Sequence, residues 1–444
     1  MNYLKIVWVF CLAWAVNAVS PVLLQHIAHL GGAETSIAQT LWCLSLFLGF
    51  GWACSKAAEG TVFPSFTLQL LVGIVLHDAL APLSVQVTLA VVVCTALAAI
   101  ILKAGGDEVD RQAFLKIAYP TVMIAVVGYL VTFFVTYALL LALGLEGNTA
   151  ALLAAIMGST DPAALIPTLK QLTVRAEYRR VSDMAVAESA LNDAVGAIFT
   201  SAIAAMVIGG AQLDSVQGLA GGLFSSANLA LLGGQFLWGT VAGLVGWACM
   251  YAFERYKRSH HATGADEPVY DFAIALAGPL VTFMFAQLIH GNGFLAAFIA
   301  GLLGNFNRGS RAFHALIHSM ETKIESVAKP TIFMMVGPFV ALPDLANTAG
   351  LGLGVALLFM LVARPVAVLL SLLPTRMSMK EKLFLCAVRE TGVIPVVLAV
   401  MTVAQLPQMT QLMPLTAWVV IWTLTLTLLP ALTPWWARKL NILE

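Results

Sequence analysis

Two stretches of the sequence decide the fold: Met157-Gly158-Ser159-Thr160-Asp161-Pro162-Ala163 and Arg389-Glu390-Thr391-Gly392-Val393-Ile394-Pro395. Each lies inside an apolar segment and brings polar residues, glycine and proline together near its middle. Proline removes a backbone donor from a helix, and unwound backbone at membrane depth is tolerated only where it lines a cavity or the protein interior. We therefore expect two discontinuous helices around one binding site, rather than two simple proline kinks.

The composition places both stretches in a membrane. The chain has 444 residues, of which 60% are hydrophobic and 10% are charged, so we do not expect a water-soluble fold. A helix crosses a bilayer with about 20 apolar residues. We predict an all-α polytopic membrane protein, a single membrane domain over residues 1–444 with about fourteen transmembrane helices. The predicted segments are 4–24, 36–56, 61–80, 86–104, 113–143, 149–170, 181–209, 227–253, 269–289, 292–306, 322–342, 349–373, 381–404 and 413–434.

The basic residues are distributed on one side of these segments. If residue 1 is inside, 21 of the 23 Lys and Arg residues fall in cytoplasmic loops or segment ends, and the outer loops contain none. This asymmetry predicts cytoplasmic N- and C-termini by the positive-inside rule. The two exceptions, Arg364 and Arg389, lie within apolar segments, where a charge is costly and needs a partner. A formal net charge of zero argues against nucleic acid as a partner.

The order of the segments indicates an inverted repeat. An additional N-terminal helix within residues 1–35 precedes six spans, a single linking span over 227–253, and six more spans. The two groups of six spans then have opposite orientations in the membrane, and each interrupted segment is the fifth span of its group. This arrangement is typical of secondary transporters. The first segment could also be a signal peptide, but its apolar run, residues 6–24, is longer than the usual signal core of about 7–15 residues, so we expect a retained helix.

Asp161, in the first interrupted segment, is expected near the middle of the membrane. It lies about twelve residues from the outer end of its segment, or about 18 Å at 1.5 Å per residue, within a core of about 30 Å. A carboxylate there could neutralise the positive helix N-termini that meet at the interruption. It could also bind the ion directly, and both roles remain open.

The segment 181–209 carries a second carboxylate at mid-membrane depth, Asp193. Ser189 and Asp193 are four residues apart and share one helical face, while Glu188 and Asn192 share the adjacent face. A carboxylate with a hydroxyl one turn away is a hard oxygen site suited to a small alkali cation. Desolvation favours the uncharged form of a carboxyl group, so Asp193 could hold a proton instead. A site that holds either one is the simplest form of exchanger.

Two pairs of charged residues are predicted to have structural roles. Glu188 and Arg364 lie at similar distances from the inner ends of their segments, which predicts a buried ion pair. Arg389 and Glu390 lie at the second interruption, where Arg389 could compensate the exposed carbonyl groups of a helix C-terminus.

Several of these stretches resemble a known family. The sequence Thr160-Asp161-Pro162, followed by Glu188-Ser189-Ala190-Leu191-Asn192-Asp193, resembles the paired signatures of monovalent cation/proton antiporters. Asn192-Asp193 with the preceding Glu188 is similar to the electroneutral branch, which includes the sodium/proton exchangers. The stretches 291–301 and 363–365 also resemble that branch, and the likeness covers roughly residues 36–434.

The resemblance implies a homodimer with elevator-type alternating access and two crossed discontinuous helices. It implies a dimerisation domain over 36–104 and 269–342, and an ion-transporting core domain over 113–209 and 349–434. By motif match, Asp193 would carry the cation (Na⁺) or the proton, and Ser189, Thr160, Asp161 and Asn192 would belong to its site. Glu188 and Arg364 would form the structural pair.

Three features depart from the family pattern. The family often has Arg-Gly where this chain has Arg389-Glu390, so an additional buried acid is present. Many members carry an acidic residue at the inner end of the span that precedes Gly105-Gly106, and this chain has Lys103 there. The first helix is additional to a plan of thirteen spans.

We therefore expect a transporter, not an enzyme, that exchanges Na⁺, or Li⁺, for H⁺ across a bacterial inner membrane and serves pH homeostasis. It would need no cofactor, and its partners would be the cation, protons, membrane lipid and a second copy of the chain. A potassium/proton antiporter is the nearest alternative. A sodium-coupled solute transporter would need a pocket of polar groups that the sequence does not suggest. An intramembrane aspartyl protease using Asp161 and Asp193 would need a Gly-x-Gly-Asp element, which is absent from the sequence.

Overall fold

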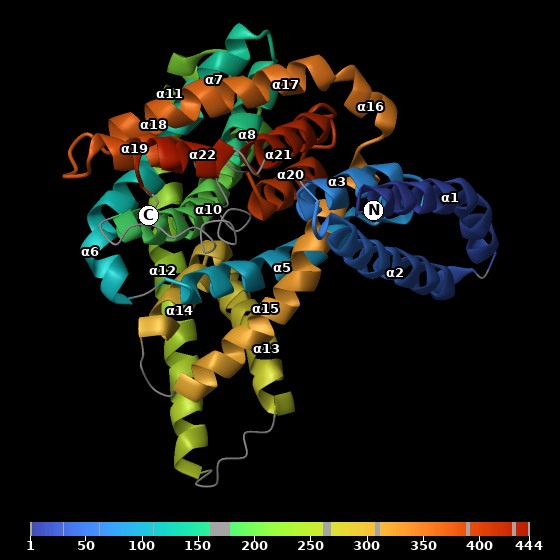
Figure 1. The fold of residues 1–444 in the computed structure, drawn as a ribbon, viewed down its shortest axis with the longest axis horizontal. Helices are drawn as coiled ribbons and strands as arrows, with labels where there is room; N and C mark the ends of the chain where they lie inside the picture. The colour runs from blue at the N-terminus through green and yellow to red at the C-terminus, as the bar shows by residue number, and fades with distance from the viewer. Residues whose placement is uncertain are drawn as a thin grey trace.

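The fold is seen in a computed structural model of the chain. It describes residues 2–29, 31–61, 63–109, 111–159, 178–260, 268–306, 311–387, 391–428 and 432–442. Over these residues the chain is helical and contains no β-strand. Two groups of helices project from a larger body: one to the right and one downward in Figure 1.

Within the described residues, seven helical stretches are long and apolar enough to cross a membrane. They agree with the predicted all-helical, polytopic class, while several other apolar helices are shorter than a full span. The seven are Tyr3–Ala28, Gly32–Ala58, Val87–Asp107, Phe114–Ala142, Arg180–Ile208, Ser226–Phe253 and Ala349–Ser371.

The group to the right consists of α1 (Asn2–Ala28), α2 (Gly32–Ala58) and α3 (Ser65–Val75). Helix α1 is fastened to the turn after α3 by one amide side chain. Asn17 Nδ2 donates to Asp78 Oδ2 at 2.9 Å, and Asn17 Oδ1 accepts from the backbone N–H of Ala79 at 2.9 Å. The first helix is therefore an integral part of this packing.

Helix α3 is shorter than predicted. The sequence predicts a span over 61–80, but α3 covers 11 residues, or about 16 Å, and turns lead to the short helix α4 (Ala81–Val85). The prediction is wrong in extent because distant groups satisfy the backbone after α3. Besides the Asn17 contact, Trp42 Nε1 donates to the carbonyl of Ala79 at 3.0 Å. The turn is also joined to the 3₁₀ turn η4 (Gly337–Phe339), because the side-chain atom His77 Nδ1 lies 2.8 Å from the carbonyl oxygen of Gly337.

The downward group contains α12 (Ser226–His260), α13 (Pro268–Leu288), α14 (Gly293–Phe306), α15 (Arg311–Met334) and α5 (Val87–Asp107). Helix α12 continues seven residues beyond the predicted linking span. Its last turns, from Glu254 to His260, are polar and contain residues with good helix propensity, so the helix extends past the apolar stretch.

The larger body contains two long helices that each include a π-helical turn. The first runs through α6 (Arg111–Val122), η1 (Met123–Gly128) and α7 (Tyr129–Ala142). The second runs through α17 (Ala349–Leu358), η5 (Phe359–Ala363) and α18 (Arg364–Ser371). Around them lie α8 (Gly147–Met157), α10 (Arg179–Ile208), α11 (Val216–Leu223), α16 (Leu342–Asn347), α19 (Met379–Ala387), α20 (Val393–Gln405), α21 (Leu412–Leu428) and α22 (Leu432–Lys439).

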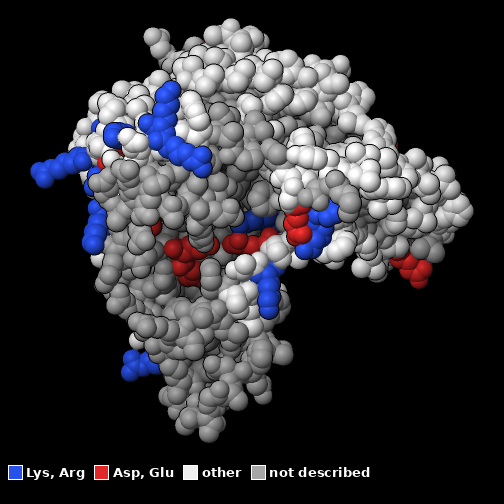
Figure 2. Space-filling view, in the orientation of Figure 1, with Lys and Arg blue, Asp and Glu red and all other residues white. Residues whose placement is uncertain are grey.

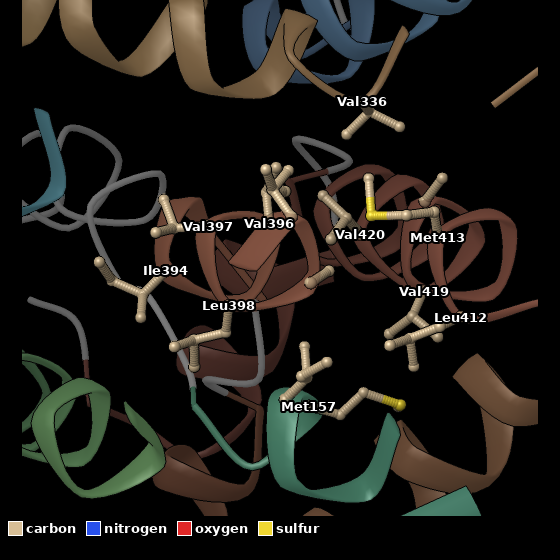
Figure 3. Close-up of a cluster of buried hydrophobic side chains, with 14 of the residues drawn as sticks. Met157, Val336, Ile394, Val396, Val397, Leu398, Leu412, Met413, Val419 and Val420 are labelled. Atoms are coloured by element: carbon tan, nitrogen blue, oxygen red, sulfur yellow. The ribbon is translucent and has the colours of Figure 1, made fainter. Parts of the chain in front are cut away.

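Helices α8 and α20 form the interior of this body. Each is apolar on all sides, which is the pattern of a helix surrounded by protein. Residues Ala150–Met157 are all buried, and so are Val393–Val400. Figure 3 shows Met157 at the end of α8 near Leu398 of α20, with Val419 and Val420 of α21 beside them. Each buried helix ends or begins next to one of the two interruptions in the sequence.

Figure 2 shows Lys and Arg side chains on the face that is turned to the viewer, and acidic side chains in a hollow at its centre. In the ribbon view, α5 crosses this area. Near its end, the Lys103 ammonium lies 2.5 Å from Asp107 Oδ2, one turn later, and both side chains are largely buried.

Helices α5 and α14 pack at backbone distance. A Cβ atom at Gly301 would overlap the carbonyl oxygen of Lys103, and one at Gly106 would overlap the carbonyl oxygen of Phe298. Small residues permit such close approach between membrane helices. Any larger side chain at position 301 must push the two helices apart.

We predict that Gly301→Ala lowers the thermal unfolding temperature of the purified protein, because its methyl group meets backbone that cannot rotate away. Gly233→Ala in α12 is the matched control, since a Cβ there meets nothing within 4 Å and alanine favours the helix by about 0.5–1 kcal/mol. Equal melting temperatures for Gly301→Ala and the wild type would contradict the close packing of α5 and α14.

Candidate functional site

Helix α10 carries Glu188 and Asp193, and its first turn is held by a residue of another helix. Arg180 Nε donates to Glu381 Oε1 at 2.5 Å and Arg180 Nη2 donates to Oε2 at 2.8 Å. The Glu381 carboxylate also accepts from the backbone N–H of Ser378, and the backbone N–H of Glu381 donates to the Ser378 hydroxyl oxygen, which makes a capping box at the start of α19. The beginning of α10 is thereby joined to the helix that leads into the second interruption.

Four side chains predicted for the site lie together on α10 and are buried: Glu188, Ser189, Asn192 and Asp193. Alanine and glycine dominate the positions between and after them, including Ala190, Ala194 and Gly196. These small residues let α8, α14 and α20 pack against α10 at this level.

Asp193 receives a hydrogen bond from a residue outside α10. The Ser159 hydroxyl donates to Asp193 Oδ1. Ser159 is 0% exposed and Asp193 is 6% exposed. Ser159 is the second residue after the end of α8, at the first interruption. The sequence drew attention to the hydroxyl of Ser189, and Ser159 is a further hydroxyl at Asp193 that it did not single out.

Glu188 and Arg364 meet in a bidentate ion pair. Arg364 Nη1 donates to Glu188 Oε1 at 2.7 Å and Arg364 Nη2 donates to Oε2 at 2.9 Å, and both side chains are at most 2% exposed. Parallel bonds of this kind are among the strongest in proteins. They bring together the two residues that the sequence placed at equal depth.

The π turn η5 precedes Arg364 directly. The N–H of Arg364 bonds to the carbonyl of Phe359, five residues back, and Pro365 cannot donate to the carbonyl four residues before it. A π turn adds one residue to the helix, so the residues after it are rotated by about 100° relative to an uninterrupted α-helix. The direction of the Arg364 side chain toward α10 depends on this turn.

Asn192 lies on the Glu188 side of the site. Its Nδ2 donates to Glu188 Oε1 at 3.3 Å, so one carboxylate oxygen accepts from both Arg364 and Asn192. The sequence had grouped Asn192 with the ion-binding residues. Three of the four residues thus divide into two sets: Glu188 accepts from Asn192 and Arg364, while Asp193 accepts from Ser159.

Thr160, Asp161, Arg389 and Glu390 lie outside the described residues. Their predicted roles stay predictions. The second interruption is bordered by Thr391, a buried residue whose hydroxyl lies 2.5 Å from that of Thr423 in α21.

Lys103 is adjacent to the site through the backbone of α5. A Cβ at Gly105 would lie 3.5 Å from the Cβ of Ala190, next to Ser189 on α10. Lys103, which stands where many family members have an acidic residue, forms an ion pair with Asp107 of the same helix.

The sequence matches the family model described as sodium/hydrogen exchanger, transmembrane, over residues 43–434. The chain belongs to this family. Its members are transporters rather than enzymes, so the family supports the predicted class of protein.

Two curated relatives show how far the likeness extends. The K(+)/H(+) antiporter NhaP of Alkalimonas amylolytica is 29% identical over 303 residues, which cover 68% of this chain and 49% of that protein. Na(+)/H(+) antiporter 1 of Methanocaldococcus jannaschii is 27% identical over 376 residues, covering 80% and 82% of the two chains. This chain thus aligns with about half the length of the potassium antiporter.

The fold is similar to that of a solved structure. The sodium proton antiporter MjNhaP1 from Methanocaldococcus jannaschii at pH 8 superposes with a TM-score of 0.71 and 23% identity, over 87% of this chain and 97% of that one. At this identity the likeness establishes the fold alone.

We predict that Glu188→Ala and Arg364→Ala each strand a buried charge and lower the stability of the folded protein by about 3–5 kcal/mol. Exchanging the two residues, Glu188→Arg with Arg364→Glu, should recover part of the loss. The measurement is the thermal unfolding temperature in detergent.

Lys56→Ala is the control for this experiment, because it removes an exposed ion pair with Glu59 and should change stability by less than about 1 kcal/mol. An Arg364→Ala protein as stable as the Lys56→Ala protein would show that the buried pair is not structural.

Proposed function

We propose that the protein is a secondary antiporter that exchanges a monovalent cation for a proton, and that Asp193 carries each in turn. The observation that supports this most directly is the environment of Asp193: a buried carboxylate on α10 that accepts a hydrogen bond from the Ser159 hydroxyl. Family membership supports the same class of activity.

Competition between a proton and a cation for the Asp193 carboxylate is sufficient to explain exchange. When Asp193 is protonated, the neutral carboxyl group is tolerated in the buried site and no cation is attracted. When the proton leaves, carboxylate and hydroxyl oxygens are suitable ligands for an alkali cation. Ser189, Thr160 and Asp161 would complete the site, as the motif match implies.

The neighbouring charges favour a ratio of one proton to one cation. Glu188 is held by Arg364, and the amide of Asn192 cannot carry a proton in exchange. On this proposal Asp161 lines the site but is neutralised by helix termini, so it exchanges no proton. Arg389 and Glu390 compensate the second interruption, and the cycle moves no net charge.

We propose Na⁺ as the main cation, with Li⁺ accepted and K⁺ as the alternative. The relatives carry names of both kinds, one a K(+)/H(+) antiporter and another a Na(+)/H(+) antiporter. A single carboxylate site does not fix the ionic radius, so ion preference needs a direct assay.

An inverted repeat of two six-helix halves belongs to the same proposal. The fourth span of each predicted half contains a π turn, Met123–Gly128 in the first and Phe359–Ala363 in the second. The span that follows each contains one of the interruptions. Matching irregularities at matching positions support the repeat and the crossing of two discontinuous helices.

The repeat suggests how the chain is divided. We propose a core domain over 113–209 and 349–434 that moves, elevator-like, against a dimerisation domain over 36–104 and 269–342. Large apolar side chains are exposed on α13 within the proposed dimerisation domain, including Val281, Met284 and Leu288. They would face lipid or the second copy of a homodimer.

The proposed location is a bacterial inner membrane with both termini in the cytoplasm. The basic residues of the loops support this orientation through the positive-inside rule. The face with Lys and Arg side chains in Figure 2 would then be the cytoplasmic one.

The test is transport by purified protein in acid-loaded vesicles. Adding Na⁺, Li⁺ or K⁺ in turn should raise the internal pH, with the largest rate for Na⁺. The rate should not depend on an imposed membrane potential, because no net charge moves. Asp193→Asn should abolish exchange at every pH, since an amide neither carries a proton nor attracts the cation.

Exchange that persists in Asp193→Asn would refute the assignment of the site. A rate that rises steeply with membrane potential would refute the one-to-one ratio, with Glu390 as the next proton carrier to examine. Glu59→Gln serves as the control, because it changes an exposed acid without touching the site.

A further inference from the structure

Tyr129 lies where the first interruption begins, yet no motif in the sequence draws attention to it. It is the first residue of α7, directly after the π turn η1, and only 2% of it is exposed. Its hydroxyl donates to the carbonyl oxygen of Ala155 at 2.7 Å. Ala155 lies in the last turn of α8.

This hydrogen bond takes the place of one that the helix lacks. The last four carbonyl groups of an α-helix have no partner within the helix. In an uninterrupted helix the carbonyl of Ala155 would accept from the N–H of Ser159, but α8 ends at Met157 and Ser159 lies beyond it. The Tyr129 hydroxyl satisfies the carbonyl that the interruption leaves open.

The ring of Tyr129 fits between the end of α8 and helix α10. A Cβ at Gly158 would lie 2.5 Å from the ring atom Cε2, and a Cβ at Gly196 would lie 3.4 Å from the same atom. The ring also packs on Phe199, with 5.3 Å between centroids. Glycine at position 158 is therefore required for the ring to lie this close to the backbone.

The same contact includes Ser159. A Cβ at Gly196, one turn after Asp193, would lie 3.2 Å from the Cβ of Ser159. Tyr129, Ser159 and the Asp193 turn of α10 therefore form one packed unit. The direction of the Ser159 hydroxyl depends on the position at which α8 ends. Tyr129 holds this C-terminal end of α8 in place.

We propose that Tyr129 is a positioning residue for the ion site. It caps the end of α8 through Ala155 and thereby holds the Ser159 hydroxyl against Asp193. The inference rests on the proposed exchange at Asp193, and it adds a neutral, non-ligand residue that sets the affinity of that site. Tyr129 contacts neither the cation nor the proton.

The test is Tyr129→Phe, which removes the hydroxyl and keeps the ring. The concentration of Na⁺ that gives half-maximal exchange should rise about five-fold, the equivalent of one ordinary hydrogen bond of about 1 kcal/mol. The maximal rate at saturating Na⁺ should stay within about two-fold of the wild type, since the ligands themselves are unchanged.

Tyr137→Phe is the matched control. Tyr137 lies two turns further along α7, is equally buried, and donates to the carbonyl of Leu213 at 2.5 Å in a loop away from the site. If the Tyr129 hydroxyl is only structural, both variants should lose stability to a similar extent and both should keep the wild-type half-saturating concentration. That result would overturn the proposal.

A double variant tests whether Tyr129 acts through Ser159. Ser159→Ala should also raise the half-saturating concentration of Na⁺. The double variant, Tyr129→Phe with Ser159→Ala, should have a half-saturating concentration no higher than that of Ser159→Ala alone. If the fold-changes of the two single variants multiply in the double variant, the two residues act independently, and the positioning role is refuted. Wild-type protein that does not exchange at all would refute the proposed function instead, so the two failures are distinguishable.

Discussion

The buried pair of Glu188 and Arg364 is the interaction on which the rest of the site depends. A charge at this depth without its partner is far more costly than the pair, so α10 and α18 must meet at this level. The π turn before Arg364 gives the guanidinium its direction, and Asn192 adds a further donor to the same carboxylate. With Glu188 occupied in this way, Asp193 is the other buried acid on α10, and it is the one to which the proposed mechanism assigns the exchange.

The site is built where helices end inside the protein. Helix α8 is buried on all sides and ends at Met157, so its terminal carbonyl groups need donors that water cannot supply. Tyr129 supplies one, and Ser159, just beyond the end, turns its hydroxyl to Asp193. On the proposed mechanism, the end of the helix lets the chain bring the Ser159 hydroxyl to the ion site, and burial there strengthens electrostatic interactions.

Much of this arrangement could be predicted from the sequence. Glu188 and Arg364 could be paired because both lie in helices without a break, where residue counts translate approximately into depth even across the π turn before Arg364. Ser159 could not be assigned, because the path of the chain after a helix end decides which of several hydroxyl groups reaches Asp193. The early end of α3 could not be predicted for a similar reason: the partners of the backbone after Val75, Asn17 and Trp42, come from distant helices. The Lys103–Asp107 pair could have been read from its spacing of four residues.

The central claim is that a cation and a proton compete for Asp193, and proton release on cation binding tests it most directly. Purified protein in weakly buffered detergent solution, near the midpoint of its transport pH profile, would receive NaCl while the pH is recorded. Choline chloride would serve as the ionic-strength control. The account predicts release of protons that approaches, at saturating Na⁺, the fraction of chains protonated at Asp193 at that pH, and none from Asp193→Asn protein. Equal release from wild-type and Asp193→Asn protein would contradict the account.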